Sequence, residues 1–235
     1  MEAAIVAGVG PGLGASLARA FSREGYSLGL FSRKVQSSEP VAAQIRSHGG
    51  KAVALSVDVT QRDGVFEAVE KLRAELGPIT VLAYNASGFG RGNFLDLEPE
   101  TIRQSFEVGV MGAVHLAQAI IPHMLQAGHG FISLTGATAS LRGRAGFAPL
   151  AIAKSSLRML GQSLAREFHP KGIHVVHVIV DGQIDTPKLR AREPHRVTET
   201  LIPPDAIAAA IIHSFRQPRN AWTHEIDIRP CGESF

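Results

Sequence analysis

A run of closely spaced glycines follows the first apolar segment of the chain and directly precedes a segment with a helical pattern. It reads Gly8-Val9-Gly10-Pro11-Gly12-Leu13-Gly14. Glycines at such a turn let the backbone approach a pyrophosphate closely, and the free N–H groups at the start of the helix meet its negative charge. A bare glycine-rich stretch is a weak signal, but between a strand and a helix it predicts a dinucleotide site.

The end of the second apolar segment bears on which dinucleotide binds. An acidic side chain there would accept hydrogen bonds from a ribose 2′-hydroxyl and would repel a 2′-phosphate. The chain instead has Ser32, Arg33 and Lys34, a hydroxyl and two cations that suit a dianionic phosphate. The sequence therefore favours NADP(H) over NAD(H), with solvated loop charges as the alternative interpretation of Arg33 and Lys34.

Short apolar segments alternate along the chain with segments of helical periodicity. This order predicts an α/β fold, namely a single-domain Rossmann fold with a doubly wound, mostly parallel sheet of about seven strands and helices on both faces. Strands are expected at 3–7, 27–31, 52–57, 81–84, 131–134, 174–180 and 225–228. Helices are expected at 13–24, 40–48, 63–76, 99–126, 147–168 and 203–216. No repeat or low-complexity tract divides the pattern, so we expect one dinucleotide-binding domain over residues 1–235.

The segment from about 186 to 204 differs from the rest of the chain because it is rich in proline and charge. Long irregular insertions in compact domains are usually functional or disordered. We expect this segment to form a mobile lobe on the substrate side of the ligand crevice. An inert surface loop is an equally good interpretation.

Three further motifs follow the predicted strands in a fixed order. Asp58-Val59 comes after the third strand, Tyr84-Asn85-Ala86-Ser87 after the fourth, and Asp181-Gly182-Gln183-Ile184-Asp185-Thr186 after the sixth. Together with the glycine run, the chain resembles the short-chain dehydrogenase/reductase family, whose corresponding motifs are T-G-x-x-x-G-x-G, an adenine-contacting Asp-Val, N-N-A-G and P-G-x-x-x-T. The chain departs from these motifs at Ala7 and Asp181, which replace a threonine and a proline, and it retains Asn85 of N-N-A-G.

The resemblance implies a set of residues that hold the nicotinamide cofactor. In the last motif, the backbone and the threonine hydroxyl hold the nicotinamide amide. The implied cofactor-binding residues are Gly8, Gly12, Leu13, Gly14, Ser32, Arg33, Lys34, Asp58, Val59, Asn85, Ala86, Lys154, Gly182, Ile184 and Thr186.

The resemblance also implies where the catalytic groups should be. In the family a tyrosine transfers the proton, a lysine one helical turn later assists it and holds the nicotinamide ribose, a serine orients the substrate oxygen and an asparagine supports a water relay. These positions fall on Leu150, Lys154, Gly136 and Gly109. Only the lysine can act, so we expect an atypical member that lacks the catalytic Tyr, Ser and Asn. The changes Leu150→Tyr, Gly136→Ser and Gly109→Asn are expected to supply these groups and to create or raise carbonyl reductase activity.

The missing tyrosine leaves the proton donor of the reaction open. A positioned acid contributes roughly 10²- to 10⁴-fold to the rate of such a step. Nearby hydroxyl groups are weak acids, and they belong to Thr135, Thr138, Ser140 and Tyr84. Asp181 is a further candidate, because a carboxyl group in an apolar crevice can have a raised pKa, although capping the next turn is its commoner role. The candidate catalytic residues are therefore Lys154 and Asp181.

Charge and composition limit the partners of the chain. The net charge is +3, and the basic residues are scattered without interleaved aromatic residues, so no nucleic acid is expected. Arg91, Arg142 and Arg144 lie in loops on the expected substrate side and favour an anionic small molecule, with solvated loop arginines as the alternative. His169, His174 and His177 lack a repeated ligand spacing, so no metal site is expected.

The apolar segments also bear on location and assembly. No apolar run approaches the roughly 18 residues of a membrane helix, and no leader is visible, so we expect no membrane association and a cytoplasmic location. The resemblance implies a homodimer or homotetramer formed through the helices at 99–126 and 147–168. Their apolar faces are either such an interface or ordinary core, and they include Ala113, Ala117, Leu157 and Leu164.

Three classes of function are compatible with this pattern. The first is an NADP(H)-dependent oxidoreductase that acts on a small carbonyl or alcohol with a non-standard proton donor. The second is a non-catalytic NADP(H)-binding sensor or scaffold, which intact binding motifs beside an emptied catalytic centre would suit. The third is non-redox chemistry, since the fold does not dictate the reaction.

Overall fold

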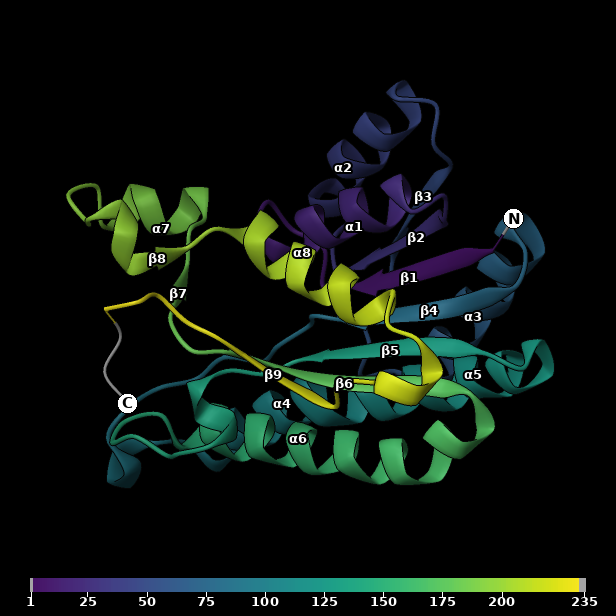
Figure 1. Ribbon diagram of the computed structural model, residues 1–235. Coiled ribbons are helices and arrows are strands. Elements are labelled where there is room, and N and C mark those ends of the chain that lie inside the picture. The colour runs from purple at the N-terminus through teal and green to yellow at the C-terminus, as the bar shows by residue number, and fades with distance from the viewer. Residues whose placement is uncertain (1, 233–235) are drawn as a thin grey trace.

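A seven-stranded, entirely parallel sheet forms the centre of the computed structural model, which describes residues 2–232 (Figure 1). Its strand order is β3-β2-β1-β4-β5-β6-β9. The strands are β1 (Ala3–Ala7), β2 (Ser27–Ser32), β3 (Ala52–Ser56), β4 (Ile79–Tyr84), β5 (Gly130–Thr135), β6 (Ile173–Val180) and β9 (Glu225–Ile228). The order reverses between β1 and β4, and in such sheets a crevice that binds ligands opens at the carboxyl ends of these strands. The predicted doubly wound fold is confirmed.

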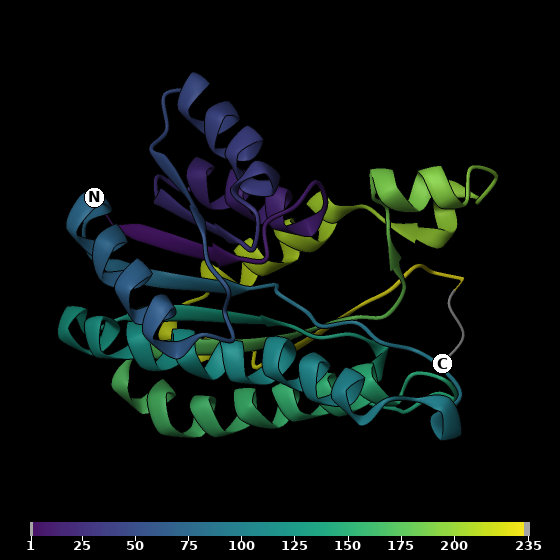
Figure 2. The same ribbon diagram turned by 180° about the vertical axis from the view of Figure 1, so that it is seen from behind.

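Helices cover both faces of this sheet, as the two opposite views show (Figures 1 and 2). Helices α3 to α6 lie on one face, and α1, α2 and α8 lie on the other. The helices are α1 (Leu13–Arg23), α2 (Val35–Ser47), α3 (Arg62–Leu76), α4 (Pro99–Phe106), α5 (Gly112–Ala127), α6 (Ala148–Phe168), α7 (Pro187–Arg192) and α8 (Pro204–Phe215). Because both faces are covered, every residue of β1, β2, β4 and β6 is buried, which explains their nearly continuous apolar sequences.

The helix predicted at 99–126 is one helical segment with a π-helical turn in its middle. Glu107–Met111 forms this turn between α4 and α5. A Cβ on Gly112, just after the turn, would lie 2.4 Å from the hydroxyl oxygen of Tyr84, so the helix passes this strand end closely only because residue 112 is glycine. Turns of this kind are frequently found at functional sites.

The same segment, Pro99–Ala127, is long and apolar enough to cross a membrane by length and mean hydropathy alone. However, 61% of its apolar window is buried inside the protein. It packs against α3, α6 and β4, so its apolar residues serve as core.

Helix α2 begins earlier than predicted. The helical periodicity placed the start at about residue 40, whereas the helix starts at Val35 and contains Pro40. The buried residues Val41, Ala42 and Ile45 hold the helix against the sheet. This packing outweighs the hydrogen bond that Pro40 cannot donate.

The segment predicted as an irregular lobe contains regular structure. It includes α7 and strand β8 (Leu201–Ile202), which pairs in parallel with β7 (Gln183–Ile184). The hydroxyl of Thr186 accepts a hydrogen bond from the Leu189 amide and caps α7, and Pro187 occupies its first turn. The lobe projects at the end of the sheet toward which the strands point (Figure 1). Its mobility stays a prediction.

Candidate functional site

A groove of about 930 Å³ opens at the carboxyl ends of β1, β2 and β4. It brings together many of the predicted cofactor-binding residues, namely Gly8, Ser32, Arg33, Lys34, Asp58, Val59, Asn85 and Ala86. Gly10 of the predicted glycine run also lines the groove, whereas the sequence did not point to other lining residues, among them Ser37 and Gln104. Ser37 was missed because the start of α2 was placed too late in the chain.

The glycine turn borders this groove and is shaped by close backbone contacts. Gly8 has a φ of +87°, and a Cβ there would lie 2.5 Å from the Ala86 nitrogen. The side-chain amide of Asn85 donates to the carbonyl of Gly8 at 2.9 Å and joins the turn to the end of β4. Added atoms on Gly10 would meet nothing within 4 Å. The turn is therefore packed on its inner side and open toward the groove.

The far end of the groove carries two exposed cations, Arg33 and Lys34. The hydroxyl of Ser32 donates to the Lys34 carbonyl at 2.8 Å and lies 2.8 Å from the Ser38 hydroxyl. Ser56 donates to the Arg33 carbonyl at 3.0 Å. The serines thus hold the backbone of this turn, while both cationic side chains extend from it at the edge of the groove.

Other predicted cofactor residues lie across the crevice, outside this groove. Gly12 faces Thr186, whose Cγ2 would be 2.9 Å from a Cβ on Gly12. Gly182 lies against Pro230, whose Cδ would be 2.8 Å from a Cβ at that position. The hydroxyl of Thr186, expected at the nicotinamide, caps α7 in this structure. Thr186 therefore lies beside the glycine turn, and the contact of Gly182 and Thr186 with a nicotinamide stays a prediction.

Lys154 is buried on α6 and its side chain reaches the carboxyl end of β5. Its Nζ donates to the carbonyl oxygen of Thr135 at 2.6 Å, and the residue is 4% exposed. Burial lowers the pKa of this ammonium group from 10.5 to about 8, because the charged form is poorly solvated there. Leu150, one helical turn earlier, is partly buried and has no titratable group.

The residues predicted at the serine and asparagine positions are closely packed. A Cβ on Gly136 would lie 2.4 Å from Nε2 of His177, and a Cβ on Gly109 would lie 3.0 Å from the Cβ of Ala153. A serine at position 136 therefore has no room beside the imidazole. The expectation that Gly136→Ser supplies a substrate-orienting hydroxyl is wrong for this geometry.

Asp181 ends β6 with both carboxylate oxygens engaged. Oδ1 accepts a hydrogen bond from the hydroxyl of Thr138, and Oδ2 lies 3.1 Å from a guanidinium nitrogen of Arg229. The residue is 2% exposed. These contacts connect the segments that follow β5, β6 and β9, and the role of Asp181 as an acid stays a prediction.

Tyr84 does not reach the crevice as a donor. It is fully buried, and its hydroxyl donates to the carbonyl of Val108 in the π-helical turn. Burial raises the pKa of this phenol well above its usual range. Tyr84 is therefore a core residue.

The loops after β4 and before α6 meet at the substrate side of the crevice. The Gly92 amide donates to the Gly146 carbonyl at 2.9 Å and joins the two loops. Arg91, Arg142 and Arg144 are exposed on these loops.

The predicted histidine set is divided between two places. His169 and His174 lie near Trp222, and the ring of His174 stacks on the indole with centroids 4.7 Å apart. His177 lies next to Gly136 instead. Between residues 2 and 232 the structure contains no group of three or more His, Cys, Asp or Glu residues arranged to hold a metal ion.

Comparison with known proteins identifies the family. The model of the short chain dehydrogenase family matches residues 2–196. The chain belongs to the short-chain dehydrogenase family. This result confirms the family implied by the sequence motifs.

Individual members of this family resemble the chain over most of its length. The short-chain reductase protein NovJ of Streptomyces niveus is 32% identical over 188 residues, which cover 78% of this chain and 70% of NovJ. A short-chain dehydrogenase structure from Rhodopseudomonas palustris is 33% identical, with a TM-score of 0.82 and coverage of 97% and 98%. A gluconate 5-dehydrogenase from Burkholderia cenocepacia, solved with NADP and tartrate, shares the fold at 23% identity, with a TM-score of 0.84 and coverage of 97% and 93%.

Proposed function

We propose that this short-chain dehydrogenase is an NADP(H)-dependent oxidoreductase that acts on a small, anionic carbonyl or alcohol. The observation that carries the proposal is the groove at the carboxyl ends of β1, β2 and β4, which is lined by the glycine turn and by the cations Arg33 and Lys34. The buried ammonium group of Lys154 lies outside this groove, at the carboxyl end of the strand β5 that neighbours β4.

The residues of the groove fit an NADP(H) molecule. The open side of the turn at Gly10 leaves the space that a pyrophosphate needs, and the amides at the start of α1 can meet its charge. Arg33 and Lys34 suit a 2′-phosphate, because a planar guanidinium binds it through two hydrogen bonds and an ammonium adds a point charge. The groove residue Asp58 lies at the predicted adenine side. NADP is also named in the solved complex of the gluconate 5-dehydrogenase, which supports this cofactor.

Lys154 is the residue that we assign to both binding and proton supply. The cofactor, when bound, carries the hydride. An ammonium group with a pKa of about 8 is mostly charged at pH 7 and can donate a proton to an oxygen that becomes negative. Its bond to the Thr135 carbonyl directs Nζ toward the end of β5, so it can also donate to ribose hydroxyls.

The loop arginines support an anionic substrate. Arg91, Arg142 and Arg144 come from two loops that a backbone hydrogen bond joins. Guanidinium groups bind carboxylates and phosphates in a planar geometry. We also infer a cytoplasmic location and a homodimer or homotetramer, which the family resemblance favours.

A second candidate function is an NADP(H)-binding sensor or scaffold without turnover. The packing at Gly136 favours it, because a Cβ there would lie 2.4 Å from Nε2 of His177, and a Cβ on Gly109 would also lie close to Ala153, at 3.0 Å. In this alternative, Lys154 only binds the cofactor.

A binding and turnover experiment separates the two functions. Purified protein is titrated with NADPH and NADH by fluorescence, and then incubated with NADPH and a panel of aldehydes, ketones and keto acids. Tighter binding of NADPH together with its oxidation by keto acids supports the proposed function. Tight binding without turnover supports the sensor, and the absence of dinucleotide binding contradicts both.

A further inference from the structure

Three hydroxyl groups lie at the carboxyl end of β5, and the structure separates their roles. Oγ1 of Thr135 is buried, and among the described residues it has no hydrogen-bond partner. Ser140 is 4% exposed and its hydroxyl lies 3.3 Å from Nε2 of His177. Thr138 is partly exposed. Among the three, only Thr138 has a side chain that a substrate in the crevice can approach.

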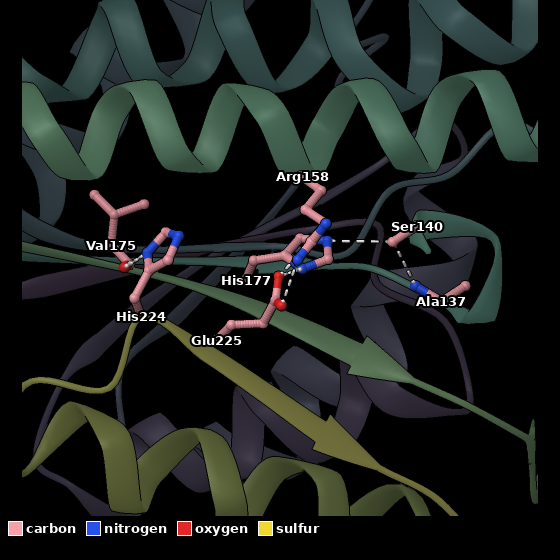
Figure 3. Close-up of polar contacts among 7 residues, drawn as sticks. All are labelled: Ala137, Ser140, Arg158, Val175, His177, His224 and Glu225. Atoms are coloured by element: carbon pink, nitrogen blue, oxygen red, sulfur yellow. Dashed lines mark hydrogen bonds and ion pairs between the residues drawn. The ribbon is translucent and has the colours of Figure 1, made fainter. Parts of the chain in front are cut away.

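A network of polar side chains, buried at Ser140 and His177 and partly exposed at Arg158 and Glu225, holds Ser140 (Figure 3). Nδ1 of His177 lies 3.2 Å from a carboxylate oxygen of Glu225, and Arg158 donates to the same carboxylate at 2.6 and 2.9 Å. Four elements contribute to it, since Arg158 is on α6, Glu225 on β9, His177 on β6, and Ser140 in the 3-10 turn Thr138–Ser140.

This polar network has one consistent arrangement of protons. Arg158 holds the pKa of Glu225 below its usual range, so the carboxylate is ionised and can only accept. Nδ1 of His177 therefore carries the proton, and Nε2 of the neutral ring accepts from the hydroxyl of Ser140. The oxygen of Ser140 in turn accepts from the Ala137 amide at 3.1 Å.

The Ser140, His177 and Glu225 side chains have the order found in serine hydrolases, but their burial argues against that chemistry. A nucleophile must be accessible to its substrate, whereas Ser140 is 4% exposed and His177 is fully buried. The polar network is better suited to fixing the position of the turn that contains Ser140.

This turn is held from a second side through Thr138. The hydroxyl of Thr138 donates to Asp181, which Arg229 also contacts. Thr138 is thereby joined to Asp181, which directly follows β6 and precedes Gly182 in the segment expected at the nicotinamide. The ring of His177 meanwhile fills the space beside Gly136, which leaves position 138 as the nearest site for an accessible hydroxyl.

We propose that Thr138 supplies the hydroxyl that orients the substrate oxygen, and that His177 is a positioning residue that holds Thr138 in place through Ser140. This inference rests on the proposed oxidoreductase function. Because the hydroxyl hydrogen of Thr138 is directed to Asp181, its oxygen lone pairs are free to accept from a substrate hydroxyl. When the substrate is a carbonyl that is reduced, rotation of the Thr138 hydroxyl lets it donate a hydrogen bond to the carbonyl oxygen.

The test uses the full-length protein and the carbonyl compound that gives the fastest NADPH oxidation in the panel. Thr138→Val is expected to lower kcat about 10²-fold, the usual effect of removing one oriented donor, while the Kd for NADPH stays unchanged. Thr138→Ser should restore most of kcat. Ser47→Ala, an exposed hydroxyl on α2, is the matched control and should behave as the unmodified protein.

The positioning role is tested with two substitutions of His177. His177→Phe fills the space without hydrogen bonds, and Glu225 keeps its partner Arg158, so no charge is left unpaired. It should lower kcat by about 10- to 100-fold, as a misplaced reacting group does, and should speed hydrogen exchange at the Ala137 amide. His177→Gln retains a polar group toward Ser140 and should recover part of both effects.

Each failure has a distinct signature. Turnover in the unmodified protein with an unchanged kcat in Thr138→Val overturns this inference and leaves the proposed function intact. Absence of turnover with every compound overturns the proposed function, and the role of Thr138 with it. Unchanged Ala137 exchange in His177→Phe overturns the positioning role whether or not turnover occurs.

Discussion

Lys154, Arg33 and Lys34 differ in their surroundings, and this difference sets how much each cation is expected to contribute to cofactor binding. Lys154 is buried, so a hydrogen bond from its ammonium group is worth about 1.5 to 3 kcal/mol. Arg33 and Lys34 are exposed, so salt screens them and their effect depends on two-point contact with a phosphate. The buried lysine is therefore expected to control overall affinity, and the exposed pair to control the choice of cofactor.

Replacement of Lys154 should weaken cofactor binding. Lys154→Ala is expected to raise the NADPH Kd by about 10- to 100-fold, as the loss of one charged hydrogen bond implies. Since the pKa of the ammonium group is about 8, its charge is lost as the pH rises through 8, so affinity in the unmodified protein should fall above that pH. Fluorescence titrations from pH 6.5 to 9 measure both effects. An equally steep pH dependence in Lys154→Ala would contradict the assignment.

Replacement of the two exposed cations should change cofactor preference. Arg33→Ala combined with Lys34→Ala is expected to weaken NADPH far more than NADH, because only NADPH carries the 2′-phosphate. Titration calorimetry with both cofactors measures the difference. The matched control is Arg62→Ala combined with Lys71→Ala, which removes two exposed cations on α3. Equal losses for the two cofactors would exclude a 2′-phosphate contact.

Contacts between neighbouring strands decide which substitutions the site accepts. β5 and β6 are paired, with Leu134 opposite His177, so the imidazole lies beside the last residues of β5. Helix α6 packs over the same strands, where a Cβ on Gly161 would lie 3.1 Å from Leu134. Side chains added in this layer therefore meet atoms that the backbone holds in place.

The substitution Gly136→Ser should reduce stability instead of improving the site. The added atoms would overlap the ring of His177, and overpacking of this kind costs about 1 to 3 kcal/mol. The double change Gly136→Ser with His177→Ala removes the overlap and should be more stable than the sum of the single changes predicts. Urea unfolding of the three variants measures this coupling. Additive effects would show that the two residues do not interact.

The fold as a whole contains buried titratable rings whose charged forms are disfavoured. Burial lowers the pKa of His177 and of His174 from 6.5 to about 4. Around His177 the other charged groups are Glu225, Lys154 and Arg158. The unfolded chain therefore binds protons between pH 6.5 and 4 that the folded protein does not bind, and acid favours unfolding.

Stability should decrease in this pH range for that reason. The free energy of unfolding is expected to fall as the pH is lowered from about 6.5 to 4, by up to about 3 kcal/mol for each ring. Because the pKa of Glu225 is also lowered, protonation of this carboxylate decreases the free energy of unfolding further at more acidic pH. Urea unfolding at pH 7, 6 and 5 measures the slope, and His177→Phe should reduce it. A slope that stays the same in that variant would mean that His177 does not contribute.

Assembly is the remaining prediction for the whole molecule. Ala113, Ala117 and Leu157 are buried in the core of one chain, so they are not available to an interface. Ile152 and Met159 on α6 are 41% and 50% exposed, and they offer an apolar surface for a second copy. Light scattering at micromolar concentration should give the mass of a dimer or tetramer, and Met159→Glu should lower it. A monomer mass for the unmodified protein would contradict this prediction.

The alternation of strands and helices along the chain, a parallel sheet with helices on both faces, and the glycine turn followed from the sequence alone. Short β-branched segments, 3.6-residue periodicity and glycines at a strand end are local properties, and each can be recognised within about 15 residues. The limits of β1 and β9 were predicted to the residue, whereas the start of α2 was not, because the packing of Val41 and Ile45 outweighed the local preference of Pro40.

Only the tertiary structure decided what surrounds the end of β5. The imidazole of His177 comes from a strand about 40 residues later in the chain, and Glu225 comes from almost 50 residues beyond that. No local pattern predicts that these side chains meet beside Gly136, because parallel pairing brings together residues that are distant in sequence. The family motifs suggested an emptied catalytic centre at Leu150, Gly136 and Gly109, whereas the structure shows that a histidine from the neighbouring strand fills the space beside Gly136.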